Sequence, residues 1–143
     1  MNVEHILAAK GRDVLTIEPD RTLAEAARIL TERKIGAVVV TDGNRAVLGI
    51  LSERDIVRAV ARGGATALEH PVSRYMTGKV VTCTGHSSIN ELMEVMTERK
   101  FRHVPIVENG RLAGIISIGD VVKHRVAEIE AEHQALREYI ATA

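Results

Sequence analysis

The sequence predicts a mixed α/β (α+β) fold built from two consecutive β-α-β-β-α units. Residues 14–57 align with residues 80–122 at an offset of 66, with fourteen identities and one single-residue gap. The order of short apolar runs, amphipathic stripes and turns is the same in both copies. A unit of about 60 residues buries only about 60% of its unfolded surface and is marginal alone. We therefore expect the two copies to share an interface.

The first half of each unit is predicted to be a short strand followed by a helix. The strands are expected at residues 14–17 and 80–83. Thr22 with Glu25, and Ser88 with Glu91, match a capping box at the helix start. Apolar residues then follow at helical spacing, at positions 23, 26, 27 and 30 and at 89, 92, 93 and 96. Both methionines of this second stripe, at 93 and 96, are expected in the core.

The second half of each unit is predicted to be a hairpin followed by another helix. Two β-branched runs, residues 35–40 and 101–107, lead through turns at 42–44 and 108–110 into strands at 46–51 and 111–116. The next helix begins at Ser52 in one copy and at Ser117 in the other. One glycine pair, at 63–64, and a His-Pro step at 70–71 mark the connection. The predicted division is an N-terminal segment with the first unit (1–69), the second unit (70–125) and a helical extension (126–143).

The last helix is predicted to run from about residue 119 to 140 and carries an apolar stripe. Its members are spaced 4, 3, 4, 3 and 4 apart, a heptad seam with one polar interruption: Val122, Val126, Ile129, His133, Leu136 and Ile140. The seam is shorter than three heptads. It can pack on its own domain or pair with a second copy of the chain, and both alternatives remain open.

Composition narrows the function classes. Basic and acidic residues number 19 each and aromatic residues make up 2% of the chain, which argues against nucleic acid as a partner. A single cysteine, Cys83, excludes an internal disulfide and is expected to be a packed core thiol. The six histidines lack the spacing of a metal site. No secretory signal or membrane-spanning run is visible, so we expect a soluble cytoplasmic protein without membrane contact.

The chemistry-bearing motif closes each copy. Gly49-Ile-Leu-Ser-Glu-Arg-Asp55 recurs as Gly114-Ile-Ile-Ser-Ile-Gly-Asp120. Serine followed three residues later by a carboxylate can simply cap a helix. The motif also follows a buried strand and opens a helix, where free amides favour an anion. A hydroxyl there can donate to phosphate, and the carboxylate can accept from the diol of a ribose. Capping and binding are compatible.

These residues carry a resemblance to a family. Residues 14 to about 125 resemble a tandem pair of cystathionine β-synthase (CBS) domains, the regulatory unit called a Bateman module, in stand-alone bacterial form. Besides the two motifs above, the resemblance rests on the segments 70–77, His-Pro-Val-Ser-Arg-Tyr-Met-Thr, and 102–107, Arg-His-Val-Pro-Ile-Val. It implies two units packed about a pseudo-two-fold axis, with two clefts for adenosine-containing ligands.

The resemblance also assigns roles to individual residues. Asp55 and Asp120 would hold ribose hydroxyls, while Ser52 and Ser117 would lie near phosphate. Arg54, Arg102 and His103 are further phosphate candidates, since guanidinium matches phosphate geometry, or else are solvated surface cations. Apolar groups would flank the base: Leu15, Ala37, Val38, Ile50, Val81, Val104, Pro105 and Ile115. The copies differ at 36–37 against 102–103 and at Arg54 against Gly119, so unequal sites are expected.

The leading functional prediction is a non-enzymatic sensor of AMP, ADP, ATP or NAD(H), with S-adenosylmethionine also possible. No catalytic residues, catalytic cofactor or metal are expected. An oligomerising scaffold with degenerate sites is the alternative, and a small nucleotide hydrolase is a third reading, against which the chain offers no Walker-type phosphate loop. The resemblance predicts a homodimer. The preferred nucleotide and the downstream protein partner are not specified by the sequence.

Overall fold

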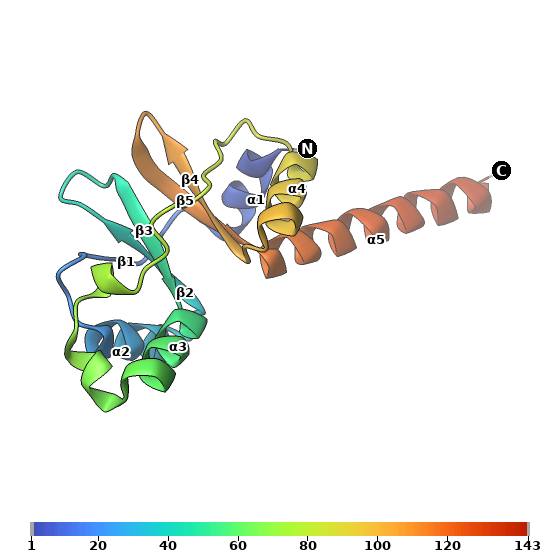
Figure 1. Ribbon diagram of the computed structural model, residues 1–143. Coiled ribbons are helices and arrows are strands. Elements are labelled where there is room, and N and C mark those ends of the chain that lie inside the picture. Colours follow the sequence, from blue (N-terminus) through green and yellow to red (C-terminus); the bar gives the residue numbers. More distant parts are fainter. Residues whose placement is uncertain (1, 143) are drawn as a thin grey trace.

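The computed structural model describes residues 2–142 and contains two small sheets, each covered by helices (Figure 1). The first half contains α1 (Val3–Lys10), β1 (Thr16–Ile17), α2 (Leu23–Arg33), β2 (Ala37–Thr41), β3 (Val47–Ser52) and α3 (Glu53–Gly63). Two 3₁₀ turns connect the halves, η1 (Ala65–Glu69) and η2 (Val72–Arg74). The second half contains α4 (Ile89–Arg99), β4 (His103–Glu108), β5 (Arg111–Ser117) and α5 (Ile118–Thr142).

The two sheets repeat the same hairpin. In the first sheet, β2 lies between β1, its parallel neighbour, and β3, its antiparallel neighbour. In the second, β4 pairs with β5 in antiparallel register. Val39 opposes Ile50 in one hairpin, and Pro105 opposes Ile115 in the other. The predicted mixed fold of two repeated units with a C-terminal helix is confirmed.

The prediction of a strand at residues 80–83 is wrong. Within residues 2–142 this segment makes only an isolated bridge, in which Cys83 pairs with Ile106. The reason lies in the neighbouring strand. In the first unit, the Val39 amide donates to the Leu15 carbonyl at 3.4 Å. The equivalent residue of the second unit is Pro105, which has no amide hydrogen to donate.

Each unit has its own hydrophobic core, and each core is closed by a segment that precedes the other unit. Helix α1 precedes the first unit, yet its Val3, Ile6 and Leu7 belong to the core of the second. The connection containing η1 and η2 precedes the second unit, yet Ala67 and Val72 belong to the core of the first. The boundaries predicted at 69, 70 and 125 are untested and stay a prediction.

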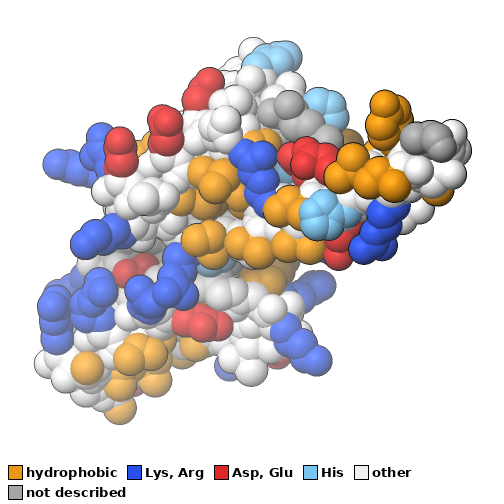
Figure 2. Space-filling model, turned by 90° about the vertical axis from the view of Figure 1, so that its right-hand side faces the viewer, with side chains coloured by type: hydrophobic (Ala, Val, Ile, Leu, Met, Phe, Trp, Pro, Cys, Tyr) orange, Lys and Arg blue, Asp and Glu red, His pale blue; other side chains and the backbone are white. Residues whose placement is uncertain are grey.

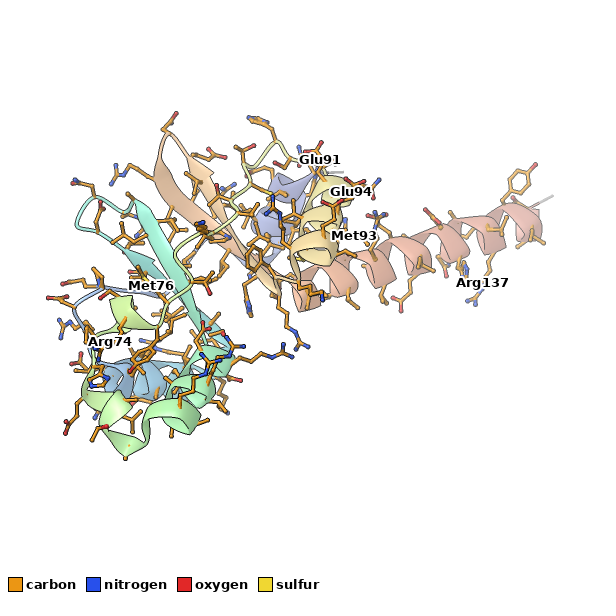
Figure 3. The ribbon with its side chains drawn as sticks, in the orientation of Figure 1. Arg74, Met76, Glu91, Met93, Glu94 and Arg137 are labelled. Atoms are coloured by element: carbon orange, nitrogen blue, oxygen red, sulfur yellow. The ribbon has the colours of Figure 1, made fainter. Side chains whose placement is uncertain are left out.

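Equivalent glycines mark where these segments cross the sheets. A Cβ on Gly49 would lie 2.7 Å from the Met76 sulfur, and one on Gly114 would lie 2.7 Å from a Leu7 methyl. Glycine is therefore required for the close approach at both strands. Figure 3 shows Met76 in the connection beside β3.

The helix starts follow the predicted capping pattern. Thr22 accepts from the Glu25 amide in α2, and Ser88 accepts from the Glu91 amide in α4. Met96 is buried as expected, but Met93 is 38% exposed, so its assignment to the core is wrong. It lies on the side of α4 that turns away from the sheet (Figure 3). Cys83 is half-buried against the second core, and burial raises the pKa of its thiol.

Helix α5 runs away from the body of the molecule for most of its length (Figure 1). Only Val121 near its start is buried, whereas the predicted apolar seam is about half exposed or more at each apolar position. Figure 2 shows orange side chains gathered along this helix. The alternative in which the seam packs on its own domain is therefore wrong. No helix within residues 2–142 combines the length and apolarity needed to cross a membrane.

Candidate functional site

The first cleft lies between the two units and has a volume of about 320 Å³. The first unit contributes the start of β2, the end of β3 and the first turns of α3, and the second contributes the segment that leads into β4. This volume is at the lower end of the range for small-molecule sites. Of the predicted site residues it brings together Ala37, Ile50, Ser52, Arg54, Asp55, Arg102 and His103.

The serine and aspartate of this cleft form a complete capping box. The Ser52 amide and hydroxyl donate to Asp55 Oδ2 at 2.9 and 3.1 Å, and the Asp55 amide donates to the Ser52 hydroxyl at 3.3 Å. The capping interpretation is thus confirmed. The other carboxylate oxygen, Oδ1, faces the Arg58 guanidinium at 3.8 Å. Both side chains also line the cleft, so the residues that cap α3 are available to a ligand in it.

Cations outnumber carboxylates in the wall of the first cleft. Its lining contains two carboxylates, Glu53 and Asp55, and four cationic side chains: Arg54, Arg58, Lys100 and Arg102. Sequence reasoning missed Arg58 and Lys100. Arg58 could have been found, because it lies three residues after Asp55 on the same helix face. The excess of positive charge favours an anionic ligand group here.

His103 lies between the two clefts and lines both of them. Its ring lies beside the residue that precedes β2, since a Cβ on Gly36 would be in ordinary van der Waals contact with it at 3.7 Å. Burial, together with the positive charge of Lys10, lowers the pKa of His103 below the ordinary value of 6.5. The side chain is therefore a neutral hydrogen-bonding group at neutral pH rather than a cation for phosphate.

This lowered pKa predicts a pH dependence of stability. Below pH 6.5 the unfolded chain takes up a proton that folded His103 resists, so the free energy of unfolding should fall as the pH drops through that range. Urea unfolding between pH 7 and pH 5 should show a smaller pH dependence for His103→Gln than for wild type. The control is His86→Gln, which removes an exposed histidine. Equal pH dependence in His103→Gln and wild type would contradict the prediction.

The second cleft, of about 390 Å³, is related to the first by the repeat but differs in its wall. It contains Leu15, Ile115 and Ser117 of the predicted site, and shares Ala37 and His103 with the first cleft. The Ser117 amide donates to Asp120 Oδ2 at 2.8 Å, and the Asp120 amide donates to the Ser117 hydroxyl at 3.1 Å. Serine and aspartate therefore cap α5 as their counterparts cap α3.

Lys10 sets the second cleft apart. Its ammonium group donates to Asp120 Oδ2 at 2.5 Å and to the Ile115 carbonyl at 2.8 Å. Burial raises the pKa of the Asp120 carboxyl, but the hydrogen bonds from Lys10 and Ser117 outweigh it and hold that pKa below its ordinary value. Sequence reasoning missed Lys10, since the contact joins residues 110 positions apart.

The remaining predicted base-side residues lie elsewhere. Val38 and Val104 have their side chains in the two cores and line neither cleft. Pro105 is buried next to Val104, and Val81 is partly buried in the segment beside β4. Strand alternation explains why Val38 and Val104 point into the cores, because each directly follows a cleft residue, Ala37 or His103, and so points to the opposite face of its sheet. Any contact of Val38 or Val104 with a ligand would have to come from the backbone.

Comparison with known families assigns the chain. The family model described as CBS domain matches twice, at residues 4–62 and 72–127. The chain belongs to the CBS domain family. A crystal structure of a CBS-domain containing protein from Agrobacterium tumefaciens is 58% identical, with a TM-score of 0.84, over 87% of this chain and 99% of that one. The resemblance inferred from the motifs is thereby confirmed.

Curated relatives and ligand-bound structures extend the comparison. An uncharacterized 17.7 kDa protein from Acidianus ambivalens is 38% identical over 77% of this chain. The matched segment spans 66% of that relative's length. The CBS domain pair of MJ0100, in complex with 5′-methylthioadenosine and S-adenosyl-L-methionine, has a TM-score of 0.80 at 22% identity, covering 90% of this chain and 98% of that one. CBSX2 in complex with AMP has a TM-score of 0.71 at 23% identity, with 80% and 88% covered. At these identities, the two CBS complexes establish the shared fold.

Proposed function

We propose that this protein is a non-catalytic regulator that binds adenine nucleotides in the clefts between its two CBS units. The observation that carries the proposal is the first cleft. It brings a carboxylate, a hydroxyl, an apolar strand residue and several cations from both units around one cavity. Two CBS-pair structures with the same fold hold AMP or adenosine-containing sulfur compounds, which supports this class of ligand.

The ligand would be oriented by charge and polarity. In the first cleft the Asp55 carboxylate would accept hydrogen bonds from the ribose diol, and Ile50 with Ala37 would contact the base. The phosphates would meet Arg54, Arg58 and Arg102. Because the wall is cationic, AMP, ADP, ATP or NAD(H) fits the first cleft better than S-adenosylmethionine, whose sulfonium is itself positive.

Regulation would follow from the position of the cleft. A ligand that contacts both units binds one relative arrangement better than another, and so shifts the population toward it. A protein partner or a second copy would respond to that arrangement. A regulator of this kind needs no bond to be made or broken, only groups that bind and orient the ligand.

The proposal is tested by thermal unfolding of the full chain with AMP, ADP, ATP, NAD and S-adenosylmethionine, each at millimolar concentration. A ligand at 100 times its dissociation constant stabilises the fold by about 2.7 kcal/mol. At roughly 2–4 °C per kcal/mol this raises the melting temperature by about 5–11 °C. A melting curve unmoved by all five ligands would sink the proposal and favour the alternative, a scaffold with degenerate clefts.

We further infer a homodimer as the form in which the protein acts. The large apolar residues that are exposed lie on three helices. They are Val57 on α3, Met93 on α4 and a row on α5 made of Ile118, Val122, Val126, Ile129, Leu136, Tyr139 and Ile140. A two-fold interface requires one self-complementary patch of this kind. The row on α5 continues beyond the end of the CBS match at residue 127, so it offers a contact outside the two CBS units.

A further inference from the structure

We propose that Lys10 is an internal competitor for the second cleft, occupying the Asp120 carboxylate that a ribose would take. The second cleft would then accept a nucleotide only when the lysine side chain leaves, and it would fill after the first. This inference rests on the proposed function of the clefts and specifies how one of them is controlled.

The lysine side chain occupies hydrogen-bonding positions that a ligand of the second cleft would use. Its ammonium group donates to Asp120 Oδ2 at 2.5 Å and to the Ile115 carbonyl at 2.8 Å, so it spans positions assigned to ribose and base. The same Oδ2 already accepts from the Ser117 amide. The side chains of Lys10 and Asp120 are 31% and 22% exposed, so the pair is partly shielded from counter-ions. A ribose hydroxyl therefore has to displace the lysine to gain Oδ2, the oxygen that Lys10 and Ser117 share.

The repeat supplies an internal comparison. Although it is Leu7 that contacts the equivalent glycine, Gly114, the sequence offset of 66 relates Lys10 to Met76. Its uncharged thioether lies on Gly49, and among residues 2–142 Asp55 has only the longer ion pair with Arg58, at 3.8 Å. The Asp55 carboxylate lines the first cleft and keeps only this long ion pair, whereas Asp120 is paired at 2.5 Å with Lys10, which itself lines the second cleft. This difference adds to those at 36–37 against 102–103 and at Arg54 against Gly119, which already make the two clefts unequal.

The lysine can leave without unfolding the helix that carries it. Lys10 is the last residue of α1, and the helix is anchored on the second core by Val3, Ile6 and Leu7. Only the side chain has to move, into solvent that it already contacts. If the closed form is populated about nine times in ten, the apparent affinity of the second cleft is about tenfold weaker than its intrinsic affinity.

If Lys10 instead contacted the phosphate of the ligand, its removal would change the affinity for AMP in the opposite direction. Removing a phosphate contact weakens AMP binding and leaves adenosine unaffected, whereas removing a competitor strengthens both ligands. Adenosine, which has no phosphate, therefore separates the two roles.

The experiment is calorimetric titration of adenosine and AMP into the full chain, in an Asp55→Ala background that disables the first cleft. Lys10→Met introduces the residue that the other copy carries. We expect Asp55→Ala/Lys10→Met to bind adenosine and AMP about tenfold more tightly than Asp55→Ala alone. The control is Asp55→Ala/Lys34→Met. It removes another lysine that lines the same cleft, and Lys34 has no ion pair in the described chain. It should bind adenosine as Asp55→Ala does.

Unchanged or weaker adenosine binding after Lys10→Met would overturn the proposal that Lys10 competes with the ligand. The proposed function would still stand in that case, provided that the wild type binds a nucleotide. An equal gain from Lys34→Met would also overturn it, because the effect would then be one of general charge. If neither wild type nor any variant binds either ligand, both proposals fall together. Should Lys10→Met fold poorly, Lys10→Gln, which removes the charge at similar helix propensity, must show the same direction of change.

Discussion

Replacing Asp55 with alanine is expected to weaken AMP binding at the first cleft by about 10- to 150-fold. The lost interactions are hydrogen bonds between ribose hydroxyls and a charged acceptor, which contribute about 1.5–3 kcal/mol. The fold should survive, because the capping contact between Asp55 and Ser52 contributes only about 1 kcal/mol. Calorimetry gives the affinity and stoichiometry, and urea unfolding gives the stability.

Asp120→Ala is the matched control for the first cleft. It removes the equivalent capping carboxylate from the other unit, so it should cost similar stability while leaving the affinity of the first cleft in place. The double variant Asp55→Ala/Asp120→Ala should bind at neither cleft. Unchanged affinity and stoichiometry in that double variant would place the nucleotide elsewhere and remove the ribose role of both aspartates.

A charge in the middle of the α5 row is expected to dissociate the dimer. Ile129 is 52% exposed in the single chain, and glutamate there would place one buried carboxylate from each copy near the two-fold axis. Central apolar contacts contribute about 2 kcal/mol or more, so the dissociation constant should rise at least about 30-fold. Light scattering at micromolar concentration should change from twice the chain mass to the 15.6 kDa of one chain.

The control for this variant is Ala135→Glu, which adds the same charge to an exposed position of α5 outside the heptad seam. It should leave the mass unchanged. A chain truncated after Arg125 locates the interface further. If the truncated chain remains dimeric, the contact belongs to the earlier helices, around Ile56 and Val57 on α3 and Val121 and Val122 on α5. A wild-type mass of 15.6 kDa, with and without AMP, would contradict the dimer itself.

Much of the fold was predictable because short-range interactions determine it and the same interactions occur in both copies. The capping pairs, the hairpin turns and the serines that begin α3 and α5 are all set by residues within a few positions of one another. The reduced first strand of the second unit was predictable in principle, since Pro105 removes the amide that Val39 uses. Helix α1 was missed although Val3, Ile6 and Leu7 have helical spacing. It is only eight residues long, too short to be stable without the core it covers.

The candidate site was predictable where one motif contains its groups, and unpredictable where distant segments meet. Ser52, Asp55 and Ile50 lie in a single run, and the structure places them in one cleft. Lys10 and Asp120 are 110 positions apart, so only the packing of α1 on the second unit brings them together. The alternation of β2 and β4 decides that Ala37 and His103 face the clefts while Val38 and Val104 face the cores.

The crossed placement of α1 and the η1–η2 connection has a consequence for how this chain can be divided. A fragment ending at the boundary between the copies would keep α1 without the core that α1 covers. The complementary fragment would expose the part of its own core formed by Ile106 and Ile116. We therefore expect that neither half folds independently, although each has its own sheet. The molecule has the connectivity of an arm-exchanged dimer whose two subunits have been joined into one polypeptide, so its halves are expected to unfold in one cooperative step.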